Sequence, residues 1–192
     1  MSTYIKAYFL TLLMLILLAA SINILVDPYG IHNLVSIKGI NSPKSPMQNH
    51  EKFFKAYRSG KLKPQAVALG TSRADFGLDP SADIWGDTQP RYNIALAGGD
   101  VYVTRRFLEH IMAIQPVTQL VYGLDFFTFN AMRPQAADYN GDILAIDDHG
   151  SNNPLFMQKL SFTSTFTMSA LLESFTTILN SRNAFTQMID FN

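Results

Sequence analysis

The sequence predicts an α/β fold built on a parallel sheet and preceded by one transmembrane helix. Three short apolar runs, at residues 65–69, 92–96 and 120–124, each end in small or polar residues. Helical patterns separate the runs, and the alternation of strand and helix is typical of a parallel sheet with right-handed crossovers. A longer apolar segment near the N-terminus stands apart from this pattern and predicts the membrane helix.

The N-terminal segment at residues 7–26 carries no charged side chain and is long enough to cross a bilayer core of roughly 30 Å as a helix. A cleaved signal peptide is the alternative, because Ala19-Ala20-Ser21 offers small residues to a peptidase. The apolar run continues to Val26, which favours an uncleaved anchor. Only Lys6 precedes the run and several lysines follow it, so charge leans against an outward-facing domain.

The signal-like position of the anchor instead predicts a single-pass protein of a bacterial inner membrane, with its domain facing the periplasm or the cell exterior. We expect an anchor at residues 1–27, a linker at 28–47 and an α/β domain at 48–192. Asp27-Pro28-Tyr29-Gly30 predicts a turn, and the many breakers up to Pro46 predict irregular structure.

Within the α/β domain the spacing of apolar residues predicts a helix over 47–58, ended by Ser59-Gly60. Asp100 is expected to cap a second helix over 101–114, with Arg105, Arg106 and Glu109 facing away from its apolar stripe. That stripe comprises Val101, Leu108, Ile111, Met112 and Ile114.

The last third of the chain predicts a long loop over 132–154 and then a helix over 156–180. The apolar residues expected on one side of this helix are Phe162, Phe166, Leu171, Phe175 and Ile178.

Composition excludes several classes of function. The net charge of zero gives no reason to expect a nucleic-acid partner, and the absence of cysteine excludes disulfides and thiolate metal sites. Asp142, Asp147 and Asp148 lack the alternation of a calcium loop, and Gly98-Gly99 lacks the other residues of a phosphate loop. We therefore expect neither a metal nor a cofactor.

The ends of the three strands predict one site. Ser72 follows a glycine turn after the first strand, where parallel sheets bind ligands and where a nucleophile is exposed. The backbone amides of Ser72 and Gly98 are candidate oxyanion donors if the first two strands are neighbours. Asp125 follows the third strand, but an ionised carboxylate repels an oxyanion unless it is protonated or turned elsewhere. Asn130, five residues further on, is an alternative to Asp125 as the polar group from the third strand end. Asn93 lies inside its strand and is expected to be structural.

The four histidines are the candidates for the base that would activate Ser72. His32, His50 and His110 are expected to be structural or solvated. His149 follows two aspartates in the long loop and is a candidate base, although the same residues suit an exposed turn. Arg73 is expected to pair with Asp75 or Asp79, and Trp85 and residues 126–129 to pack rather than to bind sugar.

Three blocks of this sequence resemble the SGNH hydrolase superfamily, also called GDSL-like, and in particular its membrane-anchored, extracytoplasmic members related to polysaccharide O-acetylation proteins. The matching blocks are Gly70-Thr71-Ser72-Arg73, Ala95-Leu96-Ala97-Gly98-Gly99 and Gly123-Leu124-Asp125-Phe126, with Val26-Asp27-Pro28-Tyr29-Gly30 after the anchor. The resemblance implies a three-layer, flavodoxin-like α/β sandwich in which Ser72 is the nucleophile and Gly98 an oxyanion donor. Asp125 stands where the superfamily has asparagine.

The resemblance covers residues 65–130, and no histidine of an Asp-x-x-His motif follows His149. Three strands also fall short of the usual five, so the chain resembles either the first half of a longer protein or a degenerate relative. Two hypotheses follow. The first is a membrane-anchored esterase or O-acyltransferase acting on O-acetyl groups of a glycan. The second is an inactive module that binds a glycan or an assembly partner at the membrane.

Overall fold

The computed structural model of the chain describes residues 2–42, 50–130, 132 and 140–190. Its contacts divide the chain into two compact units, one formed by Met1–His50 with Leu160–Asn192 and the other by Glu51–Lys159. Residues from Leu160 onward therefore group with the N-terminal helix, whereas the boundaries drawn from the sequence place them in the α/β domain. Residues 43–47 of the expected linker lie outside the described residues.

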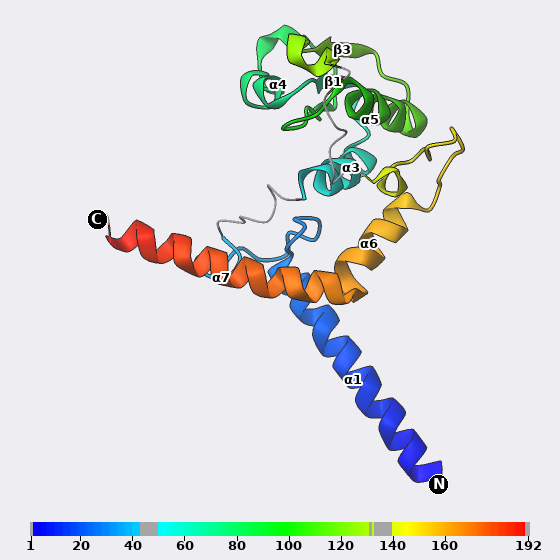
Figure 1. The fold of residues 1–192 in the computed structure, drawn as a ribbon, viewed down its shortest axis with the longest axis vertical. Helices are drawn as coiled ribbons and strands as arrows, with labels where there is room; N and C mark the ends of the chain where they lie inside the picture. The colour runs from blue at the N-terminus through cyan, green and yellow to red at the C-terminus, as the bar shows by residue number, and fades with distance from the viewer. Residues whose placement is uncertain (1, 43–49, 131, 133–139, 191–192) are drawn as a thin grey trace. The chain divides into compact units, whose positions relative to one another are not determined.

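The first unit begins with helix α1 (Ser2–Val26), which is long and apolar enough to cross a membrane (Figure 1). It is apolar on all sides, and large side chains such as Leu13 and Leu17 are more than half exposed along it. A helix of this kind finds its favourable surroundings in lipid. The N-terminal apolar helix predicted from the sequence is thus confirmed.

An ordered loop follows α1. The Asp27 carboxylate accepts hydrogen bonds from the backbone N–H groups of Ile31 and Asn33, both at 2.9 Å, and so fixes the predicted turn. Asn41 donates from Nδ2 to the backbone oxygens of Leu25 and Val35. The described part of the expected linker therefore has no helix or strand, yet it is tied back onto the end of α1.

Helix α7 and the part of α6 from Leu160 onward complete this unit. The sequence predicts one helix over 156–180, but the structure has α6 (Phe156–Phe166) and α7 (Met168–Asp190). The break falls at Thr167, whose hydroxyl donates to Thr163 O at 2.6 Å and accepts from the Ala170 N–H at 3.1 Å. Thr167 thus caps α7, a role in which threonine is favoured over continuing a helix.

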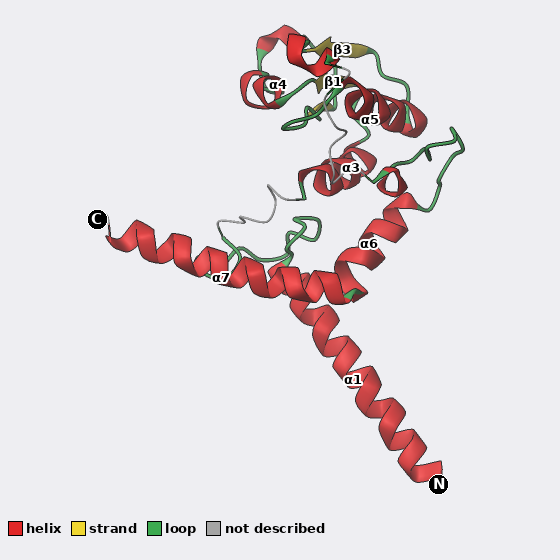
Figure 2. Ribbon diagram, viewed as in Figure 1, coloured by secondary structure: helices red, strands yellow, loops and turns green. Residues whose placement is uncertain are grey.

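The second unit contains a parallel sheet of three described strands, β1 (Ala66–Leu69), β2 (Arg91–Asn93) and β3 (Gln119–Tyr122), in the order β2-β1-β3. Val67 lies opposite Tyr92 on one side and Leu120 on the other. The mixed α/β class and the parallel sheet are confirmed, and each strand lies within two residues of its predicted start. Figure 2 shows the short strands among the helices of this unit.

The same unit contains helices α3 (Glu51–Leu62), α4 (Ser72–Gly77) and α5 (Val101–Ile114), of which α4 contacts β1 and α3 contacts α5. The prediction that Ser59-Gly60 ends the first of them is wrong, because Gly60 lies inside α3. A Cβ on Gly60 would come within 2.5 Å of Met157 Sδ and 2.8 Å of Phe156 Cζ, so this glycine makes room for packing.

Helix α5 begins as predicted, with the Asp100 carboxylate accepting from the Val103 N–H at 2.7 Å. Its predicted apolar stripe is wrong, because Met112 is exposed and Arg106 is buried. The buried face is instead rotated by about one residue position, roughly 100°, from the predicted stripe. It includes His110 and Arg106 in addition to apolar residues. Its members are Val103, Thr104, Arg106, Phe107, His110 and Ile111.

Short 3-10 helices occupy Asp83–Trp85, Phe126–Phe129 and Gly141–Ile143. Trp85 is buried against Ala66 and Ala68 of β1, as predicted. The prediction of packing fails for Phe126 and Phe129, which are 95% and 59% exposed.

Candidate functional site at the carboxyl edge of the sheet

The turn after β1 depends on a glycine. Gly70 has a φ of +144°, a region that favours glycine, and a Cβ there would lie 2.7 Å from both Gly123 O and Ala74 Cβ. The chain therefore turns sharply into α4, whose first residue is Ser72. Thr71 caps the helix, as its hydroxyl accepts from the Arg73 N–H. This geometry places Ser72 at the end of the central strand.

Backbone hydrogen bonds bring all three strand ends to one edge. The Leu96 N–H donates to Gly70 O and the Gly123 N–H donates to Leu69 O, both at 2.9 Å. The first two strands are therefore neighbours, which is the condition set above for Gly98 to serve the same site as Ser72. Gly98 is exposed in the turn that follows Leu96. Asp125 follows Gly123 on the opposite side of β1.

Asp125 is engaged by the two residues that flank Ser72. The Thr71 hydroxyl donates to Asp125 Oδ2, and the Arg73 guanidinium donates from Nη1 to Oδ1 at 2.8 Å. The carboxylate is buried, whereas the Arg73 side chain is 78% exposed and lies over the Phe127 ring. Asp125 is thus turned toward Thr71 and Arg73. The predicted pairing of Arg73 with Asp75 or Asp79 is wrong.

The Ser72 hydroxyl has no hydrogen-bond partner among the described residues, and its residue is half-buried. His149 lies in an exposed turn, where its backbone N–H donates to Asp147 Oδ1 at 2.9 Å. The backbone N–H groups of Ser151 and His149 lower the pKa of the Asp147 carboxyl, in line with an Asx-type turn. In the described part of the chain, no histidine side chain bonds to Ser72.

A network of charged side chains, which the sequence did not predict, connects α3 to the carboxyl edge of the sheet. Lys55 is buried, and its Nζ lies 2.8 Å from Glu51 Oε1 and 2.5 Å from Asp75 Oδ1 and donates to Ala95 O. Glu51 Oε2 accepts from the Ala97 N–H at 3.0 Å. The network therefore ties α3 to α4 and to the turn that carries Gly98. The i,i+4 spacing of Glu51 and Lys55 was its only sequence signal.

Asn93 has the structural role predicted for it. Its Nδ2 donates to Ala74 O at 2.9 Å and to Leu78 O at 2.8 Å, and its Oδ1 accepts from the Ala95 N–H at 3.0 Å. These bonds hold the C-terminal end of α4 against β2, and they satisfy every polar atom of a buried amide.

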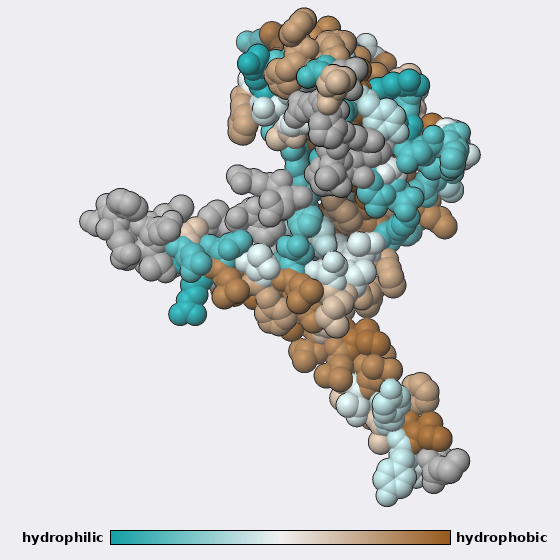
Figure 3. All heavy atoms as spheres, in the orientation of Figure 1, coloured by the Kyte–Doolittle hydropathy of each residue, from teal (hydrophilic) through white to brown (hydrophobic). Residues whose placement is uncertain are grey.

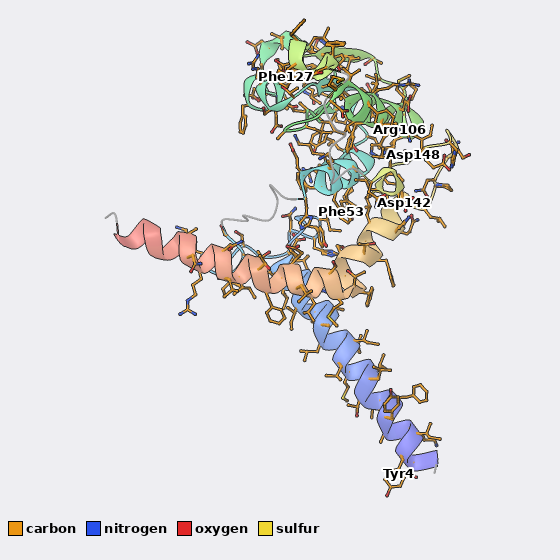
Figure 4. All side chains as sticks on the ribbon, viewed as in Figure 1. Tyr4, Phe53, Arg106, Phe127, Asp142 and Asp148 are labelled. Atoms are coloured by element: carbon orange, nitrogen blue, oxygen red, sulfur yellow. The ribbon has the colours of Figure 1, made fainter. Side chains whose placement is uncertain are left out.

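His110 and Arg106 hold the loop at residues 140–153 onto α5. The His110 ring accepts from the Ala145 N–H at Nδ1, at 2.8 Å, so its Nε2 carries the proton shared with Ser59 and Ala56 O. Burial lowers the pKa of His110 to about 4. Arg106 donates to Ile146 O at 2.9 Å and lies near Asp148, as Figure 4 shows. His110 is therefore a neutral structural histidine, as predicted.

A shallow hollow of about 280 Å³ lies between α4 and β3, beside the Arg73 and Asp125 pair. Its walls include Leu78, Val121 and Tyr122. No group of three His, Cys, Asp or Glu side chains in the described residues is arranged to hold a metal ion. No protein-family profile, curated protein or solved structure matches this chain significantly.

Proposed function

We propose that the chain is a membrane-anchored, SGNH-type esterase or O-acyltransferase that acts outside the cytoplasm on ester groups, such as O-acetyl groups, of a glycan. In this proposal the sheet is part of a three-layer α/β sandwich in a bacterial inner-membrane protein. The observation that carries the proposal is the position of Ser72. It begins a helix at the end of the central strand, with its hydroxyl bonded to no described group.

The reaction would proceed in two steps. Ser72 Oγ attacks the ester carbonyl carbon and loses its proton to a base, and the sugar oxygen leaves with a proton to give acyl-Ser72. Water or another sugar hydroxyl then attacks the acyl carbon and releases either the free acid or a new ester, which restores Ser72. The backbone N–H groups of Ser72 and Gly98 are the candidate donors to the oxyanion.

The proposal assigns Asp125 a supporting role in this chemistry. Because its two carboxylate oxygens accept from Thr71 and Arg73, the negative charge is compensated beside Ser72. Asp125 would thus fix the turn that presents the serine and would not itself donate to the oxyanion. The base has to come from outside the described arrangement, in this polypeptide or from a partner.

A second candidate function is a non-catalytic module that binds a glycan or an assembly partner at the membrane. It is favoured by the same ion pair, because an aspartate stands where the resemblance implies an oxyanion-donating asparagine. It is also favoured because no described histidine bonds to Ser72. Arg73 and the hollow beside it would then form part of the binding surface.

Ester turnover separates the two candidates. The detergent-solubilised full chain would be assayed on p-nitrophenyl acetate and on an O-acetylated glycan, with Ser72→Ala and, as a matched control on an exposed loop serine, Ser81→Ala. If the chain is an enzyme, Ser72→Ala abolishes turnover and Ser81→Ala does not. The fluorescence emission of the buried Trp85 should stay native in both variants, which shows that they are folded. Equal turnover in Ser72→Ala would remove Ser72 as the nucleophile, and glycan binding without turnover would favour the module.

A further inference from the structure

The α7 helix has an arrangement of side chains that reverses the usual pattern of a water-soluble helix. Its buried residues are small and mostly polar and repeat at helical spacing: Ala170, Ser174, Thr177 and Ser181, each fully buried. The large apolar residues occupy the opposite, exposed side and repeat in the same way: Met168, Leu172, Phe175 and Leu179, each more than half exposed. In water the two sets would exchange places.

A third side of α7 is exposed and polar. Ser169 and Thr176 lie on it, about a quarter of a turn from the apolar residues. The helix therefore has one face packed on its own unit, one face of exposed apolar side chains and one face of exposed polar side chains. A helix lying in the boundary between lipid and water requires the last two faces next to each other.

Three hydroxyl groups of α7 are hydrogen-bonded within the helix. Ser174 Oγ donates to Ala170 O at 2.9 Å, Thr176 Oγ1 to Leu172 O at 3.1 Å and Thr177 Oγ1 to Glu173 O at 2.7 Å. Thr11 and Ser21 of α1 make the same bond to the residue four positions earlier. Such bonds let serine and threonine lie beside hydrocarbon without a water partner.

The exposed apolar side of α7 is continuous with the membrane helix. Asn23, buried near the end of α1, donates from Nδ2 to Thr165 O at 2.9 Å, and its Oδ1 lies 2.9 Å from Ser174 Oγ, whose one proton is shared between Asn23 and Ala170 O. These bonds hold α7 against the end of α1. Figure 3 shows hydrophobic side chains running along α1 and on along the neighbouring side of α7. An apolar hollow of about 390 Å³ lies between α1 and α7, and its walls include Leu15, Ile22, Leu171 and Phe175.

From these observations we propose that α7, together with the end of α6, is a second membrane-contacting element that lies along the lipid surface beside α1. Met168, Leu172, Phe175 and Leu179 enter the acyl region, together with Phe162 and Phe166 of α6, and a lipid acyl chain occupies the hollow between α1 and α7. Ser169 and Thr176 face the headgroups. The occupant is neutral hydrocarbon, because Glu173 is the one charged residue at positions 160–181 and it lies 3.5 Å from His50.

The test uses the absence of cysteine from the chain. Single cysteines at Leu172, Phe175 or Leu179, and at the exposed control positions Ser169 and Thr176, are labelled with the fluorophore NBD in the full chain in phosphatidylcholine vesicles. We expect doxyl-labelled lipid to quench the first group at least about twofold more than the controls, and aqueous iodide to do the reverse. The difference in quenching should persist in high salt, because salt screens interactions between charges and not the contact of apolar side chains with lipid.

Two results would overturn the proposal. Equal quenching at Phe175 and Thr176 by both reagents would place the apolar side in water. Disulfide cross-linking between copies through the cysteine at Leu172 or Phe175, together with weak lipid quenching, would show that a second copy of the chain covers this side instead. Native Trp85 emission in every variant would establish that the labelled chains are folded. None of these readouts depends on the chemistry proposed for Ser72.

Discussion

The Arg73 guanidinium reaches across the carboxyl edge of the sheet and donates a hydrogen bond to Asp125 at 2.8 Å. The Thr71 hydroxyl donates to the other carboxylate oxygen, so Asp125 holds the residues on both sides of Ser72. A buried carboxylate with two such partners is well satisfied. Asp125 stands beside a candidate oxyanion site, and its two hydrogen bonds give it a structural role in the turn that carries Ser72.

This relationship predicts different costs for two substitutions at Asp125. Asp125→Asn keeps an acceptor for the Thr71 hydroxyl and loses only the ion pair with the exposed Arg73, so we expect a loss of about 1 kcal/mol of unfolding free energy. Asp125→Ala also leaves the buried Thr71 hydroxyl without its acceptor, and we expect about 2 to 3 kcal/mol. Urea denaturation followed by Trp85 fluorescence measures both. Equal small losses would mean that Asp125 does not hold the turn.

Gly70 and Gly77 form a matched pair at the two ends of the segment that carries Ser72. Gly70→Ala places a Cβ 2.7 Å from Gly123 O at a φ of +144°, so we expect a loss of about 2 to 4 kcal/mol. Gly77→Ala meets nothing within 4 Å and lies in α4, so it should be neutral or slightly stabilising. The same urea titration compares them. A tolerated Gly70→Ala would contradict the described turn.

His110 predicts a loss of stability in acid. Its pKa is lowered by burial to about 4 from an ordinary 6.5, so the unfolded chain takes up this proton first as pH falls. The contribution of the neutral ring is therefore complete above pH 6.5 and is lost progressively between pH 6.5 and pH 4, up to about 3 kcal/mol. His110→Gln should flatten this part of the profile of unfolding free energy against pH.

His149→Gln is the control for that experiment, because His149 is exposed and its ring makes no bond to a buried group in the described residues. We expect its pH profile to match that of the unmodified chain. A profile that flattens in both variants, or in neither, would show that another group governs the acid sensitivity.

The outward orientation is predicted by the position of the anchor and opposed by the distribution of lysines. We expect alkaline phosphatase fused after Asn192 to be active in a bacterial host, because that enzyme matures only outside the cytoplasm. An inactive fusion that is nevertheless expressed would place the α/β unit on the cytoplasmic side.

The elements of the sheet were predictable because their signals are local. Apolar runs ended by glycine define β1 and β3, and the Asp100 cap fixes the start of α5. The alternation of strands and helices predicted that the sheet is parallel, whereas the order β2-β1-β3 comes from the structure alone. Asn93 could be assigned a structural role because it lies within a strand, where a side-chain amide is used for local bonding.

The features that the sequence did not predict depend on long-range partners. The sequence predicts Arg106 on the exposed side of its helix, yet the side chain is buried and donates to carbonyl oxygens of a loop forty residues away. The sequence predicts a helix end at Gly60 because the side chains of Phe156 and Met157, which occupy the space beside this glycine, are distant in sequence. The reversed faces of α7 were missed because apolar spacing alone does not say whether lipid or protein covers a stripe.

The most direct test of the proposed function is covalent labelling of the full chain, in native-like membranes, with a fluorophosphonate followed by peptide mass spectrometry. We expect one adduct, on Ser72, that disappears in Ser72→Ala and persists in Ser81→Ala. Labelling should also fall sharply in Gly70→Ala, which distorts the turn that presents the serine. A folded chain that acquires no adduct on Ser72 would contradict the assignment of Ser72 as a nucleophile and leave the binding module as the better account.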